Sequence, residues 1–122
     1  MAKDNLSDRV MEFILQRKDE ELAKLTVKDI ARYFKISESF LGRKFKADVD
    51  ISVGKYIFRE RMFRAANLLV KNENLTIKSL AETAGFYDYD YFIRAFRQHF
   101  GVTPARYRDC KTWDIDEEVN DE

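Results

Sequence analysis

The stretch FYDYDYFIRAFRQHFG, residues 86–101, decides how the rest of the chain is interpreted. Its first seven residues alternate aromatic and acidic side chains, the period expected of a half-buried β-strand. The residues that follow lose this alternation. The stretch can therefore be a strand edge, an acidic metal loop or the opening turn of a helix. A second copy of the same pattern decides between them.

The chain contains two related segments, each about 30 residues long. Residues 25–36, LTVKDIARYFKI, share Leu, Thr, Lys and Ala at the same places with residues 75–86, LTIKSLAETAGF. After one extra residue the match resumes between residues 37–57 and 88–108. The aligned pairs include Arg43 with Arg94, Phe45 with Phe96, Lys46 with Arg97, Ser52 with Thr103 and Tyr56 with Tyr107. We interpret the segments as two copies of one helical unit.

Each copy carries the residues that typically begin and end helices. Thr26 is followed three positions later by an acidic residue, which predicts a capping box, and Thr76 opens the second copy with its hydroxyl available to unpaired backbone amides. Gly85 is suited to the left-handed residue that ends a helix. Ser37 and Asp88 can each cap a further helix soon afterwards. A short helix, a tight turn and a second helix form a helix-turn-helix unit.

The opening stretch is therefore predicted to be a helix that starts after Asp88, with residues 89–91 as its first turn and Gly101 at its end. The residues expected on its buried stripe are Phe92, Ala95, Phe96, His99 and Phe100. A calcium loop counted from Asp88 would need glycine at its sixth position and glutamate at its twelfth. The chain has Ile93 and His99 there, so both the metal loop and the strand are rejected.

The whole chain is expected to be all-α, with about seven helices and no strand. Further helices are predicted over residues 7–17 and 52–72, and a last one begins at Thr103, where Pro104 suits the first helical position. We expect one domain over residues 1–110. It would comprise a first helix-turn-helix subdomain at about 7–51, a long linker helix at about 52–72 and a second subdomain at about 73–109.

Composition fits a single globular domain of 122 residues, 45% of them hydrophobic and 36% charged. No apolar run approaches the roughly 20 residues that span a bilayer, and the N-terminus lacks the apolar core of a signal peptide. Cys110 is the one cysteine and cannot form an internal disulfide, so a cytosolic location is expected. No cofactor is expected.

The formal net charge of zero hides an uneven distribution. Residues 111–122 contain six acidic residues and one lysine, which leaves 21 basic against 16 acidic residues in 1–110. We expect this acidic tail to be disordered. The remaining balance of +5 is compatible with a nucleic-acid partner.

The stretch GFYDYDYFIRAFRQHFGVTPARYR, residues 85–108, resembles the DNA-binding domain of the AraC/XylS family of bacterial transcription regulators. The shared pattern is Gly-Phe, an acidic or small cap, Tyr-Phe, a Phe-x-x-x-Phe-Gly core, Thr-Pro and Tyr-Arg. YIFRERMFRAANLL, residues 56–69, is similar to the linker helix of that family, and the resemblance extends from about residue 7 to residue 109. It implies two helix-turn-helix units that read adjacent major-groove segments of promoter DNA.

Helix geometry is consistent with this implication. A linker of about 20 residues spans roughly 30 Å at 1.5 Å per residue. One turn of duplex DNA is about 34 Å, the separation of half-sites that are read from one face. One chain could thus place two recognition helices where other proteins need a dimer.

The residues expected to contact DNA lie opposite the buried stripe of each recognition helix. Arg43 and Arg94 are predicted to read base edges, because arginine can bond guanine O6 and N7 together. The residues predicted to tune sequence choice beside them are Ser39, Gly42, Tyr89, Asp90 and Ile93. The residues predicted to hold phosphates, through positive charge or capped helix starts, are Thr26, Ser37, Lys46, Thr76, Arg97 and Thr103.

Two of these positions fit less well. Gly42 costs about 1 kcal/mol relative to alanine inside a helix and offers no side chain to a base. Either the backbone approaches DNA closely there, or the first unit reads little sequence. Asp90 places a negative charge near phosphates, although a carboxylate can accept a hydrogen bond from cytosine N4 and stabilises a helix N-terminus.

The aromatic residues have the helical spacing of a core rather than of a platform for single-stranded bases. Those assigned to the core are Phe34, Phe40, Phe45, Phe58, Phe92, Phe96 and Phe100. Tyr89 is the exception, since it lies on an exposed first turn. One histidine and one cysteine are too few for a zinc site without several carboxylates, and no glycine-rich phosphate loop occurs, so neither a metal site nor an enzyme is expected.

The alternative function is an all-α protein-interaction module that kept this fold and lost DNA reading. Near-neutral charge, Gly42 and Asp90 favour it, while retention of both arginines favours DNA. In the AraC/XylS family a separate N-terminal sensor or receiver domain often controls activity, and activation needs a surface for RNA polymerase. The resemblance thus suggests a cytoplasmic activator that associates with the nucleoid when it is bound to DNA. Its expected partners are double-stranded DNA, RNA polymerase and an N-terminal sensor or receiver domain, with no membrane contact.

Overall fold

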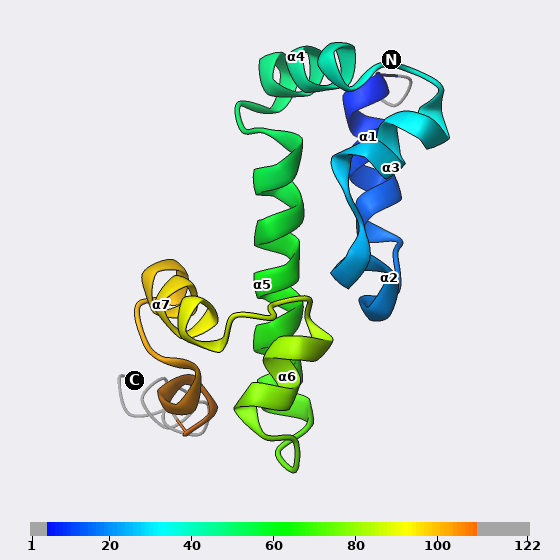
Figure 1. Ribbon diagram of the computed structural model, residues 1–122. Coiled ribbons are helices and arrows are strands. Elements are labelled where there is room, and N and C mark those ends of the chain that lie inside the picture. The colour runs from blue at the N-terminus through cyan, green and yellow to red at the C-terminus, as the bar shows by residue number, and fades with distance from the viewer. Residues whose placement is uncertain (1–4, 110–122) are drawn as a thin grey trace, which may run out of the picture. The chain divides into compact units, whose positions relative to one another are not determined.

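The computed structural model describes residues 5–109, whose regular secondary structure is entirely helical (Figure 1). The helices are α1 (Leu6–Leu15), α2 (Asp19–Lys24), α3 (Val27–Phe34), α4 (Glu38–Val49), α5 (Val53–Lys71), α6 (Ile77–Thr83) and α7 (Tyr89–Phe100). A last helical segment covers residues 104–109. No strand occurs between residues 5 and 109, and the all-α fold class is confirmed. Cys110 and the acidic tail lie outside the described residues.

The chain divides into two compact units, Met1–Arg61 and Met62–Glu122, with the boundary inside α5. The N-terminal part of α5 thus belongs to unit 1 and its C-terminal part to unit 2. Each unit contains one pair of short helices joined by a tight turn, namely α3 with α4 and α6 with α7.

The core of unit 1 lies between α1, α3 and α4. Val10 and Ile14 of α1, Ile30 of α3 and Leu41 and Phe45 of α4 are completely buried. Figure 1 shows α4 running crosswise to α1 at the N-terminal end of that helix. This packing fixes which side of α4 faces solvent.

The core of unit 2 repeats that arrangement with different side chains. Leu69 of α5, Leu80 of α6 and Phe92 and Phe96 of α7 are completely buried. Phe96 also meets the ring of Tyr107 edge-on, with ring centres 5.5 Å apart. In unit 1 the aligned pair, Phe45 and Tyr56, has the same edge-on geometry at 5.7 Å. The internal repeat is therefore a repeat of core packing as well as of sequence.

The predicted helix caps are present. The side-chain oxygens of Thr26, Ser37, Thr76 and Asp88 accept hydrogen bonds of 3.0–3.1 Å from the backbone N–H three residues later. Thr26 and Asp29 form the predicted capping box, in which Asp29 accepts a bond from the Thr26 N–H at 3.1 Å. Each cap satisfies amides that have no partner within the helix.

α2 was not predicted. It has six residues, DEELAK, and only Leu22 and Ala23 are buried, which is too little apolar periodicity to indicate a helix. Its first turn is acidic, which stabilises the positive end of a helix, and Glu21 accepts a hydrogen bond from the Lys18 N–H at 2.9 Å.

Candidate nucleic-acid interface

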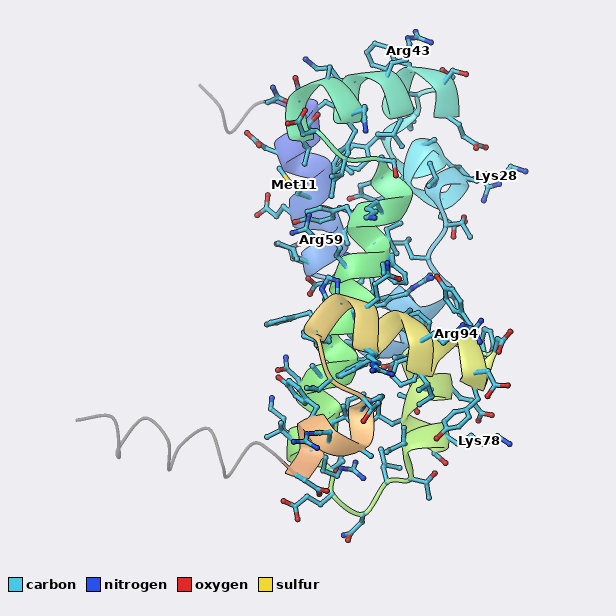
Figure 2. All side chains as sticks on the ribbon, turned by 90° about the vertical axis from the view of Figure 1, so that its left-hand side faces the viewer. Met11, Lys28, Arg43, Arg59, Lys78 and Arg94 are labelled. Carbon is cyan, nitrogen blue, oxygen red and sulfur yellow. The ribbon has the colours of Figure 1, made fainter. Side chains whose placement is uncertain are left out.

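The recognition helix of unit 1, α4, is oriented by its apolar side. With Leu41 and Phe45 buried, the predicted contacts Ser39, Arg43 and Lys46 are all exposed. Figure 2 shows the Arg43 side chain projecting outward from α4. Because Ser39, Arg43 and Lys46 are spaced by four and three residues, they form one continuous surface strip.

The recognition helix of unit 2, α7, presents a comparable strip. Arg94, Arg97 and Asp90 are exposed, and Tyr89 is 37% exposed. Ile93 is half-buried at the edge of the strip. The two guanidinium groups of α7 therefore share the solvent-facing side of the helix with one carboxylate, whereas α4 has no acidic residue at the matching position.

The four hydroxyl groups predicted to lie near phosphates already have structural partners. Thr26, Ser37 and Thr76 cap helices, and Thr103 accepts a bond from the Arg106 N–H at 3.2 Å. In each case the hydroxyl oxygen is the acceptor. Its hydrogen remains able to donate, so capping does not prevent a contact with a phosphate oxygen.

Two predictions about burial are wrong. Phe40, assigned to the core, is 45% exposed, because it lies on the first turn of α4 and only the next residue, Leu41, points inward. His99, expected on the buried stripe, is exposed. Tyr107 packs on Phe96 and Phe100 instead and completes the core there, while His99 only meets the edge of the Phe100 ring at 4.7 Å.

Comparison with known proteins places this arrangement in a family. The profile of the helix-turn-helix domain family matches residues 30–109. The Msm operon regulatory protein of Streptococcus mutans is 36% identical over 84 residues, which cover 69% of this chain and 30% of that protein.

Solved structures give the same result. The C-terminal domain of AraT, a response regulator from Geobacillus stearothermophilus, superposes with a TM-score of 0.74 at 30% identity, covering 86% of this chain and 84% of that one. A transcriptional regulator from Chromobacterium violaceum with an AraC-type DNA-binding domain superposes with a TM-score of 0.75 at 27% identity, covering 85% and 93%. This chain belongs to the AraC/XylS family.

The AraC/XylS assignment establishes a DNA-binding domain of transcription regulation. The relatives are transcription regulators rather than enzymes, as expected from the sequence. The chain spans between 13% and 39% of the length of the curated relatives that it matches. Within residues 5–109 no group of histidine, cysteine and acidic side chains could hold a metal ion, and no described helix is long and apolar enough to cross a membrane.

Two further exposed basic residues of this AraC/XylS domain were not given a role from the sequence. Lys28 and Lys78 are exposed, occupy equivalent places in the repeat and lie two residues after the caps Thr26 and Thr76. Figure 2 shows both side chains extending into solvent. The repeated lysine was visible in the sequence, and its position in the first turn of α3 and of α6 was the signal that could have identified it.

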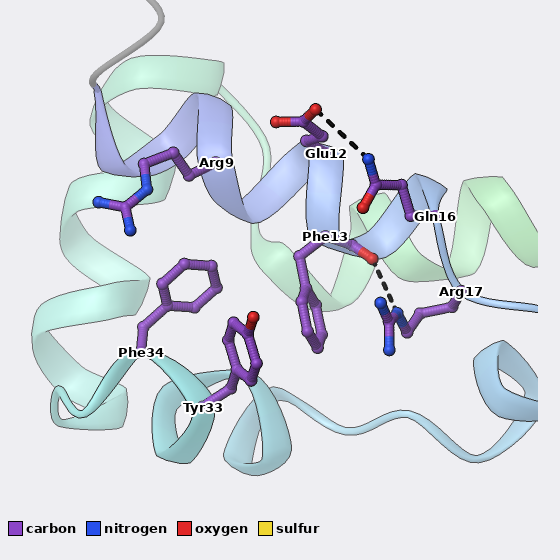
Figure 3. A pocket seen from close by; sticks show the side chains of 7 residues that line it. All are labelled: Arg9, Glu12, Phe13, Gln16, Arg17, Tyr33 and Phe34. Carbon is purple, nitrogen blue, oxygen red and sulfur yellow. Dashed lines mark hydrogen bonds between the residues drawn. The ribbon is translucent and has the colours of Figure 1, made fainter.

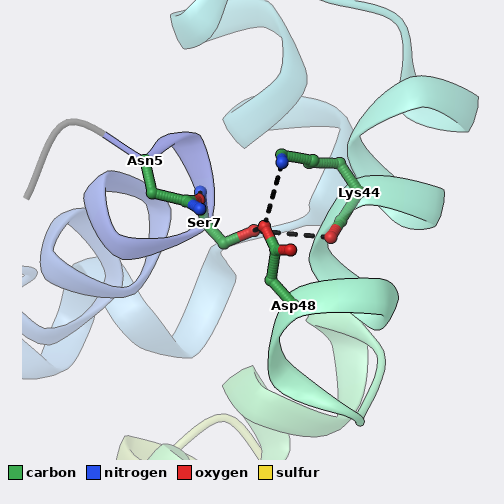
Figure 4. Close-up of polar contacts among 4 residues, drawn as sticks. All are labelled: Asn5, Ser7, Lys44 and Asp48. Atoms are coloured by element: carbon green, nitrogen blue, oxygen red, sulfur yellow. Dashed lines mark hydrogen bonds and ion pairs between the residues drawn. The ribbon is translucent and has the colours of Figure 1, made fainter. Parts of the chain in front are cut away.

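A polar contact joins α1 to the C-terminal part of the unit 1 recognition helix (Figure 4). The buried Ser7 hydroxyl donates to Asp48 Oδ2 at 2.8 Å, and Lys44 Nζ lies 3.3 Å from the same oxygen. The hydrogen bond from Ser7 and the nearby Lys44 charge lower the pKa of the Asp48 carboxyl below its usual value of 3.8. Asp48 therefore stays ionised and tethers α4 to α1.

Two arginines outside the recognition helices bind backbone carbonyls near helix ends. Arg61 donates to the carbonyls of Leu22 and Leu25, at 2.9 and 2.8 Å. Arg108 donates to the carbonyls of Leu69 and Asn72, at 3.0 and 2.9 Å. Each guanidinium binds carbonyls just before the helix-turn-helix pair of its own unit, two of which (Leu22 and Asn72) also accept a backbone N–H. Not every basic side chain of the domain is thus available to DNA.

A surface pocket of about 270 Å³ lies between α1 and α3, and none of its lining residues is a predicted DNA contact (Figure 3). The ring of Phe13 lines it, and the centre of this ring lies 4.4 Å from the ring centre of Tyr33 and 5.8 Å from that of Phe34. Arg17 stacks over Phe13 with its guanidinium carbon 4.1 Å from the ring centre, and its Nε donates to the Phe13 carbonyl. These contacts pack α1 against the first helix of the helix-turn-helix pair.

Proposed function

We propose that this chain binds double-stranded DNA sequence-specifically, with α4 and α7 inserted into adjacent major-groove segments of a promoter. We also propose the division predicted from the sequence, in which residues 52–72 form the linker between two DNA-reading subdomains. Membership of the AraC/XylS family supports DNA binding in transcription regulation. The assignment of each helix to a groove is our inference.

The observation that supports this proposal best is the matched pair of exposed arginines. Arg43 and Arg94 occupy the same register of the repeat, and each lies on the side of its helix opposite a buried phenylalanine. An arginine held in this way can donate two parallel hydrogen bonds to guanine O6 and N7. Neither Arg43 nor Arg94 belongs to a salt bridge within the described part of the chain.

The remaining contacts would set position rather than sequence. Lys46 and Arg97 follow the two reading arginines at a spacing of three residues and would neutralise phosphates on the groove wall. The capped starts of α3 and α6 direct backbone amides, together with Lys28 and Lys78, toward further phosphates. Ser39, Gly42, Tyr89, Asp90 and Ile93 would modulate which bases are accepted.

Other parts of the function follow from the family and are likewise proposals. Because the curated relatives are longer than this chain, a sensor or receiver domain would supply the signal. RNA polymerase would be the partner if the protein activates transcription. Action on chromosomal DNA would place the protein in the bacterial cytoplasm, at the nucleoid.

Titration of labelled duplex DNA tests the proposal. A random-sequence duplex and a duplex enriched from a random pool should be compared at about 50 and 200 mM salt. We expect affinity for both duplexes to fall steeply with salt, so that the slope of log affinity against log salt concentration corresponds to several neutralised phosphates. We expect Arg43→Ala and Arg94→Ala to reduce the preference for the enriched site. A salt-independent signal, or no binding, would instead support a protein-interaction module.

A further inference from the structure

Both recognition helices expose a large aromatic ring at the third position of their first turn, and α7 exposes Tyr89 at its first position as well. Phe40 is the third residue of α4 and Tyr91 the third residue of α7, and each side chain is 45% exposed. The two positions align in the repeat, one residue before the buried Leu41 and Phe92. An isolated exposed aromatic residue needs no explanation, but the same exposure at one register of two recognition helices indicates a shared role.

The local backbone holds both rings in place. The Phe40 N–H donates to Ser37 Oγ at 3.0 Å, and the Tyr91 N–H donates to Asp88 Oδ1 at 3.0 Å. These capping bonds fix the first turn from which each ring projects. A ring anchored at a capped helix start loses little conformational entropy when it becomes buried against a ligand.

Each ring is a neighbour of the arginine proposed to read guanine. Phe40 precedes Arg43 by three residues and Tyr91 precedes Arg94 by three residues, a spacing at which helical side chains lie next to each other. A guanidinium group that reaches a guanine edge would therefore bring the ring within reach of the neighbouring base pair. The chemistry of that edge then decides whether the ring is buried favourably.

We propose that Phe40 and Tyr91 read thymine by packing against its 5-methyl group, at the base pair next to the guanine that each arginine contacts. This proposal rests on the major-groove function proposed above and adds the base class that the aromatic residues select. The thymine methyl is the apolar group that base pairs present in the major groove. Phe40 has no polar atom in its side chain, so apolar contact is its available mode, and the Tyr91 hydroxyl can also donate to a phosphate.

The test is a double-mutant cycle between protein and DNA. The enriched duplex is prepared with thymine, and with deoxyuridine in its place in one half-site at a time, which removes only the methyl groups. We expect the wild-type chain to lose about fourfold in affinity per contacted methyl, the equivalent of burying one such group. Phe40→Ala should abolish this sensitivity in one half-site and Tyr91→Ala in the other.

Two variants control for folding and for general effects of losing a ring. Phe63→Ala removes a phenylalanine of α5 that is 56% exposed and should retain both methyl responses. Phe40→Leu keeps an apolar side chain and should retain most of the response at its half-site. Helix content by circular dichroism should be unchanged in all four variants, because Phe40, Phe63 and Tyr91 are not core residues.

The outcomes separate this inference from the proposed function. Salt-dependent duplex binding that requires the arginines but ignores methyl removal would overturn the thymine proposal and leave the DNA-binding proposal intact. The same conclusion would follow if Phe40→Ala and Tyr91→Ala kept the full methyl response, or if they weakened single-stranded and duplex binding equally. Absence of any duplex binding would overturn both.

Discussion

The two units place different residues at the two left-handed positions that follow their paired helices. In unit 2 these residues are Gly85, the second residue after α6, and Gly101, the first residue after α7, with φ of 96° and 85°. At the matching places unit 1 has Lys35 and Asp50, with φ of 60° and 77°. A left-handed backbone costs a residue with a side chain roughly 1–2 kcal/mol. Unit 1 therefore keeps the left-handed backbone at Lys35 and Asp50 despite this strain. The packing of the helices determines the backbone conformation there more strongly than the residue type does.

The reading surfaces differ as well. α4 presents Ser39 and Gly42 beside Arg43, while α7 presents Asp90 and Ile93 beside Arg94. If the proposed function holds, the shared arginine and the different neighbours would let the two units read different sequences with the same framework. The unit with the bulkier and charged neighbours should discriminate more between sites.

The largest effect is expected from removing either reading arginine. Arg94→Ala and Arg43→Ala should each reduce the preference for the enriched site over random duplex by about 1–3 kcal/mol. Competition binding at one salt concentration measures this preference. Arg32→Ala is a suitable control, because this exposed arginine of α3 pairs with Asp29 at 3.7 Å. An equal loss of affinity for all sequences would mean that the arginines bind phosphate only.

Exchanging turn residues between the units should change stability next most strongly. Gly101→Ala should destabilise the fold by about 1–2 kcal/mol, since a Cβ there meets no atom within 4 Å and the cost comes from the backbone alone. Asp50→Gly should be neutral or stabilising. Urea denaturation measures both, with Gly54→Ala in α5 as the control that should not destabilise. Equal tolerance of alanine at positions 54 and 101 would contradict the strain argument.

A smaller effect is expected at Gly42, which occupies the place in α4 that Ile93 occupies in α7. A Cβ at Gly42 would meet nothing within 4 Å, so Gly42→Ala should stabilise α4 by about 0.5–1 kcal/mol. If α4 reads little sequence at this position, DNA affinity should not fall. A stabilised variant with clearly weaker binding would instead show that the backbone of α4 approaches DNA too closely for a methyl group.

The smallest effect concerns the tether found in unit 1, which joins Ser7, Asp48 and Lys44. Because the folded-state pKa of Asp48 is lowered, its contribution to stability is present above the ordinary pKa of 3.8 and is lost as pH falls through the folded value. The stability difference between wild type and Asp48→Asn should therefore be constant near neutral pH and shrink in acid. Ser7→Ala should show the same trend. A difference independent of pH would exclude this role for the carboxylate.

Much of the fold was predictable from local signals that repeat. Thr26, Ser37, Thr76 and Asp88 are caps whose function depends only on the next three residues, so the sequence was sufficient to identify them. The exposed Arg43 and Arg94 followed from the periodicity of their helices. Repetition turned two weak local patterns into one strong prediction.

The features that were missed depend on packing between distant segments. Arg61 donates hydrogen bonds to the carbonyls of Leu25 and Leu22, which are 36 and 39 residues away in the chain. No local sequence pattern predicts such a distant partner. His99 was assigned to the core from helical spacing, which cannot show that Tyr107, later in the chain, packs on Phe96 and Phe100. Phe40 was misassigned because hydrophobicity alone does not distinguish a core ring from one that is exposed to solvent.

Guanine methylation protection on the enriched duplex tests most directly whether both helices of one chain read DNA. Methylation occurs at guanine N7 in the major groove, the atom that the reading arginines are proposed to contact. We predict two separate protected guanine positions, one lost in Arg43→Ala and the other in Arg94→Ala. A single protected position, or two that disappear together in either variant, would contradict the account.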